Sequence, residues 1–375
     1  MFATLDIDIR PGSGLGMFEI GSSLWTVLDT LRRFQHAFPH VEVKYDPDVS
    51  ATTPIVLHIR PHLDLLFSGI HQRLHTICVR KLRDPHPPLT LKYKDTILSS
   101  PEVFLRRVDV RRTFGPTYPG DDLRYPGLWF SFEEDGMGDG MKGGADDKMQ
   151  EVKRVLVSQK DNDGKNRDAL DEVAECPAMQ NDLSLAVVKV HDGVTLHFYS
   201  SSEAIHVQLG RTTAQDLNLD LGPPLRVHYK EDERMAIHSQ SAPFSEEESD
   251  YFYNYFQHGI DFLISGRTHT VKKIILHTNV PGTPLFQRYK RCNWEIEGLP
   301  EDDEDDTPPR KRFYDRFETI SHFLSPHEPP PSMSLDRTDD EENVTLPSSA
   351  TRLYGYDGII LEVTESSQVV AVVLF

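Results

Sequence analysis

The strongest constraint on the fold of this chain is a short order of elements that recurs along the sequence. It is clearest in DYFYNYFQHGIDFLI (residues 250–264), where aromatic residues precede Gly259 and an alternating apolar segment. Alternation with a period of two residues predicts a β-strand. The turn SGRTHT and a second predicted strand, VKKIILH (271–277), follow directly. These segments therefore predict an antiparallel hairpin.

A helix is predicted upstream of this hairpin, in LGRTTAQDLNLDLGPP (209–224). Thr212 or Thr213 can accept a hydrogen bond from the free amides at the helix start. Gly222 and the prolines after it end the helix. The recurring unit is therefore a helix, a strand, an aromatic strand, a turn and a closing strand.

The same order of elements is found in three other parts of the chain. The helices are predicted at 22–34, 99–116 and 317–326, the aromatic or first strands at 62–67, 124–132 and 354–363, and the closing strands at 73–79, 151–157 and 369–375. In the helix at 99–116, Ser100 is the predicted cap and Pro101 the first helical residue, where the missing amide of proline costs nothing.

One position relates the four copies to one another. Gly127 and Gly358 stand where Gly259 stands in the clearest copy, and His62 occupies that position in the first copy. The sequence thus predicts an α+β fold of about four degenerate helix-plus-antiparallel-hairpin units in tandem, with mostly antiparallel sheets. The alternative is that any α+β protein contains helix–hairpin segments of this kind.

Each predicted unit offers one helix and one sheet face, which is too little apolar surface for a unit to be stable alone. We therefore expect the units to pack against one another. The predicted organisation is a first unit at 1–98, a second at 99–183 with an acidic glycine-rich insertion, a third at 184–298, a linker at 299–350 with a short helix at 317–325, and a C-terminal hairpin at 351–375 that completes the fourth.

Three segments are predicted to connect the units rather than to join their cores. The parts of 133–182 that flank the predicted strand are charged and poor in large apolar residues, so we expect them to be mobile. EDDEDDTPPRKR (301–312) reads as a solvated linker. The segment at 326–350 is rich in proline, serine and acidic residues and is expected to be disordered.

The aromatic run itself has two interpretations. Tyr251, Tyr253 and Tyr255 alternate with Phe252 and Phe256, as on a strand with two amphipathic faces. Structural packing is the favoured interpretation. The second interpretation is a surface anchor for a partner protein, because tyrosine is favoured at interfaces.

The charge of the chain argues against two classes of partner. Lysine and arginine number 40 and aspartate and glutamate 59, which gives a net charge of −19. A protein that binds nucleic acid needs a positive surface to displace counterions, and anionic lipid attracts basic segments. We therefore expect no nucleic-acid binding, and membrane contact only through a partner.

The protein is also expected to be located in the cytoplasm. The three cysteines, Cys78, Cys176 and Cys292, are far apart and match neither a disulfide framework nor a zinc spacing. The first residues, MFATLDIDIR, lack the basic and apolar regions of a signal peptide. No apolar run approaches the roughly 18 residues that span a bilayer.

No catalytic motif is recognisable in the chain. PGSGLG (11–16) reads as a turn, and DNDG (161–164) lacks the acidic residues that would complete a calcium loop. There is no HExxH pair and no G-x-S-x-G elbow. The sequence therefore predicts no catalytic residue, no cofactor and no metal site.

One loop stands out as a candidate site. In LHTNVPG (276–282), His277, Asn279 and Gly282 follow a strong predicted strand. Function favours loops on rigid scaffolds, so these residues could form a polar site. The plainer interpretation is an Asn-Pro-Gly turn.

Several segments together resemble the phagosome assembly factor one family. The resemblance extends over almost the whole ordered chain, and its longest motifs are central. The segments are LDIDIRPGSGLGMFEIG (5–21), FGPTYPG (114–120), GLWFSF (127–132), LGPPLRVHYK (221–230), Met235-x-Ile237-His238, DYFYNYF-x-x-G-I-D (250–261), and LHTNVPG with Phe286, Tyr289 and Arg291-Cys292. The small α+β units are also similar, at the level of fold only, to outer-membrane lipoprotein assembly and β-lactamase-inhibitor folds.

The resemblance implies a non-enzymatic adaptor in autophagy, which acts with a WD-repeat β-propeller protein at the phagophore assembly site. The predicted partner-binding residues are His277, Asn279, Pro281, Gly282, Phe286 and Tyr289. One alternative is an enzyme or small-ligand binder with a polar pocket near 276–282. Another is a phosphoinositide-binding trafficking protein, for which the dense basic candidates are Lys272, Lys273, Arg288, Lys290 and Arg291.

Overall fold

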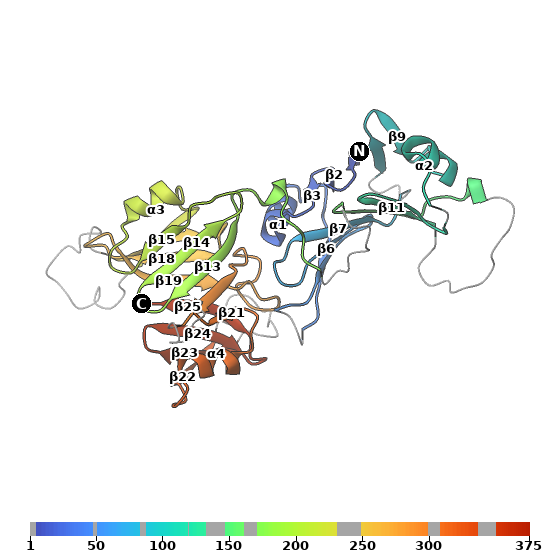
Figure 1. The fold of residues 1–375 in the computed structure, drawn as a ribbon. Coiled ribbons are helices and arrows are strands. Elements are labelled where there is room, and N and C mark those ends of the chain that lie inside the picture. Colours follow the sequence, from blue (N-terminus) through green and yellow to red (C-terminus); the bar gives the residue numbers. More distant parts are fainter. Residues whose placement is uncertain are drawn as a thin grey trace. The chain divides into compact units, whose positions relative to one another are not determined.

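The chain forms two compact units that are built mostly from β-strands. The computed structural model describes residues 5–47, 51–82, 88–118, 120–132, 147–160, 171–230, 249–298, 308–336 and 350–375. Unit 1 consists of Met1–Asp46 with Thr52–Met179, and unit 2 of Pro47–Ala51 with Gln180–Phe375. The described residues contain four α-helices and sheets that are mainly antiparallel, a mixed composition that agrees with the predicted α+β class (Figure 1).

Unit 1 contains the first two α-helices. Its elements in chain order are β1 (Leu5–Arg10), β2 (Gly14–Leu15), β3 (Phe18–Glu19), α1 (Leu24–Arg33), β4 (Val41–Lys44), β5 (Ile55–Ile59), β6 (Leu63–Phe67), β7 (Leu74–Val79), β8 (Leu89–Tyr93), β9 (Thr96–Ser99), α2 (Arg107–Phe114), β10 (Leu123–Tyr125), β11 (Leu128–Ser131), the 3₁₀ turn Asp147–Met149, β12 (Arg154–Ser158) and the 3₁₀ turn Pro177–Met179.

Unit 2 contains the other two α-helices and the longer strands. Its elements are β13 (Leu183–Lys189), β14 (Gly193–Phe198), β15 (Ile205–Gln208), α3 (Ala214–Asp220), β16 (Arg226–Tyr229), β17 (Tyr251–Tyr255), β18 (Ile260–Ile264), β19 (Val271–His277), β20 (Trp294–Glu297), β21 (Arg310–Arg312), α4 (Phe317–Leu324), β22 (Ser332–Asp336), β23 (Ala350–Tyr356), β24 (Ile359–Thr364) and β25 (Val369–Leu374).

Each unit has one smaller and one larger sheet with matching topology. The smaller sheets have the orders β3-β2-β1-β8-β9 and β15-β14-β13-β20-β21, and their central pairs β1·β8 and β13·β20 are parallel. The larger sheets, β10-β11-β12-β7-β6-β5-β4 and β16-β17-β18-β19-β25-β24-β23-β22, are antiparallel. In both units a pair of closing strands, β7·β12 or β19·β25, lies inside the larger sheet. The smaller sheets were not predicted from the sequence.

Side-chain alternation explains the position of the strands. In IVLHI of β5 and LDLLF of β6, every second residue is buried, as expected of strands with one face toward the core. β18 differs because all five residues of IDFLI are buried. Ile260, Phe262 and Ile264 share one face, as predicted, and Asp261 and Leu263 are buried on the other.

Capping residues define the helix starts in α1 and α3. Ser23 accepts from the backbone amide of Thr26 at 3.1 Å. Thr213 accepts from Asp216 N at 3.2 Å, and the Asp216 carboxylate accepts from Thr213 N at 2.8 Å, which completes a capping box. The cap predicted from the sequence is therefore confirmed at Thr213.

No helix in the described ranges has the length and apolar character that a membrane crossing requires.

The helix predicted at 99–116 begins later than expected, so this prediction was wrong at its start. Ser100 closes a turn, in which its hydroxyl accepts from the amide of Val103 at 3.1 Å. α2 begins only at Arg107, because Asp109 accepts from the amide of Arg106 at 3.1 Å and so fixes the helix start there. A serine can cap a turn as well as a helix, and the sequence pattern does not separate the two.

Two segments predicted to be linkers contain strands. The basic residues at the end of 301–312 form β21, where Arg310 and Arg312 lie 2.8 and 3.0 Å from carboxylate oxygens of Glu297 and Glu295 on β20. β22 lies within the segment predicted to be disordered at 326–350 and pairs with β23 over five residues. Backbone pairing with a neighbouring strand stabilises both segments, and composition alone does not reveal it.

Other predicted mobile stretches lie outside the described residues. They are 133–146 and 161–170 of the acidic insertion, 301–307 of the linker and 337–349 of the proline-rich segment. The DNDG segment at 161–164, which the sequence analysis interprets as a loop without a calcium site, falls there as well. Their predicted mobility stays a prediction.

Removal of the Thr213 cap should weaken unit 2. We expect Thr213→Ala to lower the free energy of unfolding by about 1 kcal/mol, because the first-turn amide loses its acceptor. Urea denaturation followed by circular dichroism measures the change. Gln215→Ala on the exposed face of the same helix is the control and should change stability by less than about 0.5 kcal/mol. Equal effects of the two substitutions would contradict the importance of the cap.

Candidate functional site

An aspartate lies buried in the middle of the larger sheet of unit 2. Asp261 on β18 is only 5 % exposed, although its neighbours on the strand are apolar. A buried carboxylate is costly unless hydrogen bonds replace its water shell. Asn254 Nδ2 donates to one carboxylate oxygen at 2.8 Å. Tyr289 Oη donates to the other at 2.6 Å, and His277 Nε2 lies 2.9 Å from it. We refer to these four residues as the Asp261 cluster.

The aromatic rings of the Asp261 cluster pack against each other. His277 stacks on Tyr289 with centroids 3.7 Å apart, and Phe256 lies 5.0 Å from Tyr289. Burial raises the pKa of Tyr289 well above its usual range, and the adjacent Asp261 carboxylate adds to the rise. The phenol therefore stays protonated at physiological pH and remains a donor to the carboxylate.

The loop between β19 and β20, residues 278–293, is held by buried polar side chains. Asn279 adopts a φ of 52°, and its side-chain oxygen accepts from the amide of Gln287 at 2.9 Å. Arg291 is 5 % exposed, and its Nε donates to the carbonyl of Thr278 at 2.8 Å. The two ends of the loop are thus fixed to each other by side-chain to backbone hydrogen bonds.

Gly259 allows the same loop to approach the sheet closely. Its φ is 71°, and a Cβ at this position would overlap the carbonyl oxygen of Lys290. Lys290 is itself buried, with its ammonium 2.5 Å from Asp182.

Burial lowers the pKa of His258 to about 4, and the Lys290 ammonium adds to this effect while Asp182 opposes it. His258 is therefore neutral at physiological pH.

Two of the five aromatic residues in the run at 251–256 are buried in packing, in line with the favoured interpretation, and three are not. Tyr255 is fully buried, and its hydroxyl donates to the carbonyl of Gly222 at 2.8 Å, which ties the end of α3 to β17. Tyr251 is 8 % exposed, and its hydroxyl lies 3.0 Å from His269 Nδ1. Phe252, Tyr253 and Phe256 are only half-buried.

The structure brings only part of the predicted partner-binding set to the surface. His277, Asn279 and Tyr289 are 6, 4 and 5 % exposed, and Pro281 is also buried. Gly282 and Phe286 are half-buried. A partner could touch the last two directly, whereas the buried four shape the loop. The partner-binding role of all six residues stays a prediction.

The Asp261 cluster has the groups of an acid–base centre but not the access. A carboxylate, an imidazole and a phenol lie within hydrogen-bond distance, which general acid–base chemistry requires. The side chains of His277 and Asp261 are each only 7 % exposed, so a substrate does not reach them in this conformation. Asn279, which the sequence placed in the same polar pocket, turns toward Gln287 instead. The geometry favours a structural role for the cluster.

The five basic residues considered for lipid binding do not form one exposed patch. Lys290 and Arg291 are buried, and Lys272 pairs with Asp250 at 2.7 Å. Lys273 lies over the ring of Phe375, 5.8 Å from its centroid, and Arg288 lies at the same distance from Phe256. Although these five residues are close in sequence, they do not line one basic concave surface.

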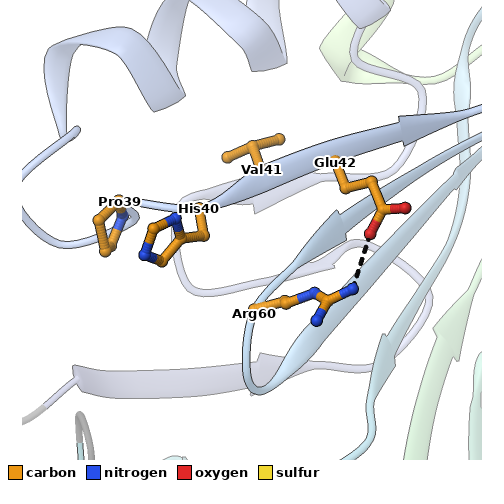
Figure 2. Close-up of a pocket in the computed structure, with 5 residues that line it drawn as sticks. All are labelled: Pro39, His40, Val41, Glu42 and Arg60. Carbon is orange, nitrogen blue, oxygen red and sulfur yellow. Dashed lines mark hydrogen bonds and ion pairs between the residues drawn. The ribbon is translucent and has the colours of Figure 1, made fainter.

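An open pocket lies in unit 1 at the outer strand β4. Pro39, His40, Val41, Glu42 and Arg60 line it, and all five are exposed (Figure 2). Arg60 and Glu42 form an ion pair at 2.9 Å, so these two charges satisfy each other. Within the described residues, no three His, Cys, Asp or Glu side chains are grouped to hold a metal ion. The pocket offers a shallow polar surface rather than a reactive centre.

The sequence analysis did not identify Asp261 and Asn254 as site residues. The available signal was an acidic residue at an inward position of an otherwise apolar strand, in GIDFLI. Its partners became visible only with the strand register, which places Asn254 opposite Asp261.

Comparisons with known proteins extend across both units. The family model described as Phagosome assembly factor 1 matches residues 14–375. A PHAF1 protein of Arabidopsis thaliana is 28 % identical, over 98 % of this chain and 92 % of the relative. PHAF1 proteins of Drosophila melanogaster and Caenorhabditis elegans are 27 and 26 % identical, over 99 and 96 % of this chain and 94 and 90 % of the relatives. No solved structure gives a significant match.

Removal of the Tyr289 hydroxyl tests the structural role of the Asp261 cluster. We expect Tyr289→Phe to lower the free energy of unfolding by about 1–3 kcal/mol, because a buried carboxylate loses one donor while the ring packing remains. Tyr253→Phe is the matched control, since no hydrogen bond of the Tyr253 hydroxyl is found in the described residues. Urea denaturation would contradict the role if both variants were as stable as the parent protein.

Acid should destabilise unit 2 through His258. Its pKa is about 4 in the folded chain against an ordinary value of 6.5, so the unfolded chain binds more protons between these values. Stability therefore falls as pH decreases from 6.5 toward 4, by roughly 2 kcal/mol at pH 5. In His258→Phe, which keeps a ring against Tyr255, this part of the loss should vanish. Unfolding curves at pH 7 and pH 5 measure the difference, and an unchanged pH dependence would refute it.

Proposed function

This chain belongs to the phagosome assembly factor 1 family, and we propose on that premise that it is a non-enzymatic adaptor in autophagy. The proposed partner is a WD-repeat β-propeller protein, which the chain joins at the phagophore assembly site from the cytoplasm. The observation that carries this proposal is the extent of the family match, residues 14–375, which includes both compact units. An adaptor binds its partners through an extended surface, whereas an enzyme needs a local reactive centre.

The burial of the polar residues supports a binding role over a catalytic one. The acid–base groups around Asp261 are enclosed by the sheet and by the loop at 278–293. Their hydrogen bonds are used to stabilise the strands that carry them. The surface of this loop includes the apolar, half-buried side chain of Phe286 next to the exposed Arg288, and an aromatic and an arginine side chain are suited to contact with a protein.

The charge balance supports a protein partner over a membrane as the direct contact. At −19 the chain is repelled by an anionic lipid surface unless a local basic patch compensates. Two of the five dense basic candidates, Lys290 and Arg291, are buried. In this proposal the β-propeller partner makes the lipid contact.

The order of elements supports the further proposal that four related modules build the chain. Each α-helix precedes a hairpin and a closing strand, and the residue just before the second hairpin strand is His62, Gly127, Gly259 or Gly358. The three glycines share nearly the same φ, 74, 71 and 71°. A common local geometry at corresponding positions is what duplication of one module would produce.

Affinity purification tests the adaptor role. The full-length tagged protein, expressed in cells, should recover a WD-repeat β-propeller protein as the most enriched partner by mass spectrometry. Phe286→Ala should reduce that recovery on the order of tenfold, because an interface aromatic contributes strongly to binding. Met333→Ser, at a side chain that is 62 % exposed on β22, is the matched surface control.

Two results would count against this proposal. The first is a folded full-length protein that recovers no WD-repeat protein under conditions in which the tag captures a known complex. The second is equal recovery by Phe286→Ala and the parent protein, which would move the contact away from the 278–293 loop. Thermal unfolding of each variant shows that loss of binding does not arise from loss of the fold.

A further inference from the structure

The outer strand β16 has an unusual surface among the described strands. It ends the eight-stranded sheet and, within the part of the chain that the structure describes, pairs only with β17. All four of its residues are exposed, and Leu225 just before it is 57 % exposed. Val227 and Tyr229 are 43 and 58 % exposed. Val227 and Tyr229, two residues apart, thus lie on one face of a sheet edge that has no further partner strand among the described residues, and the exposed Leu225 precedes them.

The residues between these apolar side chains are basic or titratable. Arg226, His228 and Lys230 alternate with Leu225, Val227 and Tyr229. Within the described residues, Arg226 and His228 form no ion pair and no hydrogen bond through their side chains. The edge therefore presents an apolar row on one face and a row with the basic side chains of Arg226 and Lys230 on the other.

The backbone of β16 also has groups directed away from the sheet. The amide of Lys230 donates to the carbonyl of Asp250 at 2.9 Å, which places this residue in a hydrogen-bonded pair. Antiparallel strands alternate between hydrogen-bonded and open pairs, so His228 and Arg226 also face β17. Val227 and Tyr229 then direct their N–H and C=O groups outward, where an added strand would bind them.

The corresponding edge of unit 1 does not have this combination. β4 ends the seven-stranded sheet, but its acidic residue Glu42 lies 2.9 Å from Arg60 and 3.8 Å from Lys44. The charges of β4 are therefore satisfied within the unit. Sheet edges are usually protected against pairing, and the β16 edge combines exposed apolar area with basic side chains that form no ion pair within the described residues.

We propose that β16 is a docking edge for an extended segment of a partner protein in which acidic and apolar residues alternate. The segment would add a strand beside Val227 and Tyr229, with its apolar side chains beside theirs and its carboxylates beside Arg226 and His228. Opposite charges on directly facing strands stabilise pairing. The net charge of −19 does not prevent this, because charges beyond about 8–10 Å are screened at physiological salt.

A second copy of this chain fits the edge less well. Antiparallel pairing of two β16 strands about a two-fold axis would place Arg226, His228 and Lys230 of one copy on the same face as those of the other. Like charges on facing strands are destabilising. Charge complementarity therefore selects an acidic strand as the occupant, and the inference does not depend on the β-propeller partner.

Synthetic peptides can test this docking edge on the full-length protein. The probes are fluorescein-labelled decapeptides: alternating Glu-Val, alternating Lys-Val, and a block peptide with five Glu followed by five Val. The alternating Glu-Val peptide should bind at least about tenfold more tightly than the other two in fluorescence anisotropy, because only its charges and apolar residues match both faces. Hydrogen exchange should show protection at 225–230.

Two substitutions separate docking from folding. Val227→Pro removes an outward amide, and proline is compatible with an edge strand whose amide faces solvent. It should reduce peptide binding at least about tenfold without changing the thermal unfolding temperature. Val41→Pro on β4, whose amide also faces outward since Arg60 donates to the His40 carbonyl, is the matched control and should leave binding unchanged.

A charge exchange gives the decisive result. The double variant Arg226→Glu with His228→Glu should prefer the Lys-Val peptide over the Glu-Val peptide, which loss of folding cannot mimic. Equal binding of all three probes, unchanged binding by Val227→Pro, or protection that maps away from β16 would overturn the proposal. A dimer of the parent protein that Val227→Pro dissociates would also overturn it, since a second copy would then be the occupant. Recovery or loss of a WD-repeat partner in cells leaves these outcomes unaffected.

Discussion

Backbone pairing between the two halves of each unit is the constraint on which the rest of the structure depends. In unit 2, β13 pairs in parallel with β20, and β19 pairs antiparallel with β25. In unit 1, β1·β8 and β7·β12 play the same parts. Without its counterpart, each half would expose two interior strand edges with unpaired amides and carbonyls. We therefore expect the two halves of each unit to be stable only together.

The buried polar groups of unit 2 follow from this pairing. Because β18 lies between β17 and β19 in the interior of a wide sheet, Asp261 is largely shielded from water, and its carboxylate is hydrogen-bonded by Asn254, His277 and Tyr289 instead. Tyr289 belongs to the loop that leads from the larger sheet to the smaller one. The cluster thus fixes the connection between the two sheets, which explains why a loop rich in Asn, Pro and Gly has so many buried side chains.

Local patterns predicted well what local interactions decide. The helix with Thr213 as its cap and the strand at 271–277 were both found from the sequence, because a cap and an alternating pattern act over a few residues. The start of α2 at Arg107 was misplaced, since Ser100 offers the same acceptor to a turn. The smaller sheets were missed because some of their strands are very short, such as Gly14–Leu15, and depend on distant partners. Asp261 was missed for the same reason, as register alone brings its donors together.

The position of β25 has a consequence for how the protein is made. This strand, Val369–Leu374, lies between β19 and β24, with four strands of the eight-stranded sheet on one side and three on the other. β19, which ends at His277, leaves the ribosome many residues earlier and waits with an open edge until its neighbour is synthesised. Pairing across such long separations is slow, and transiently exposed edges favour aggregation. During translation, chaperones that shield extended apolar segments are therefore the first binding partners this protein would need.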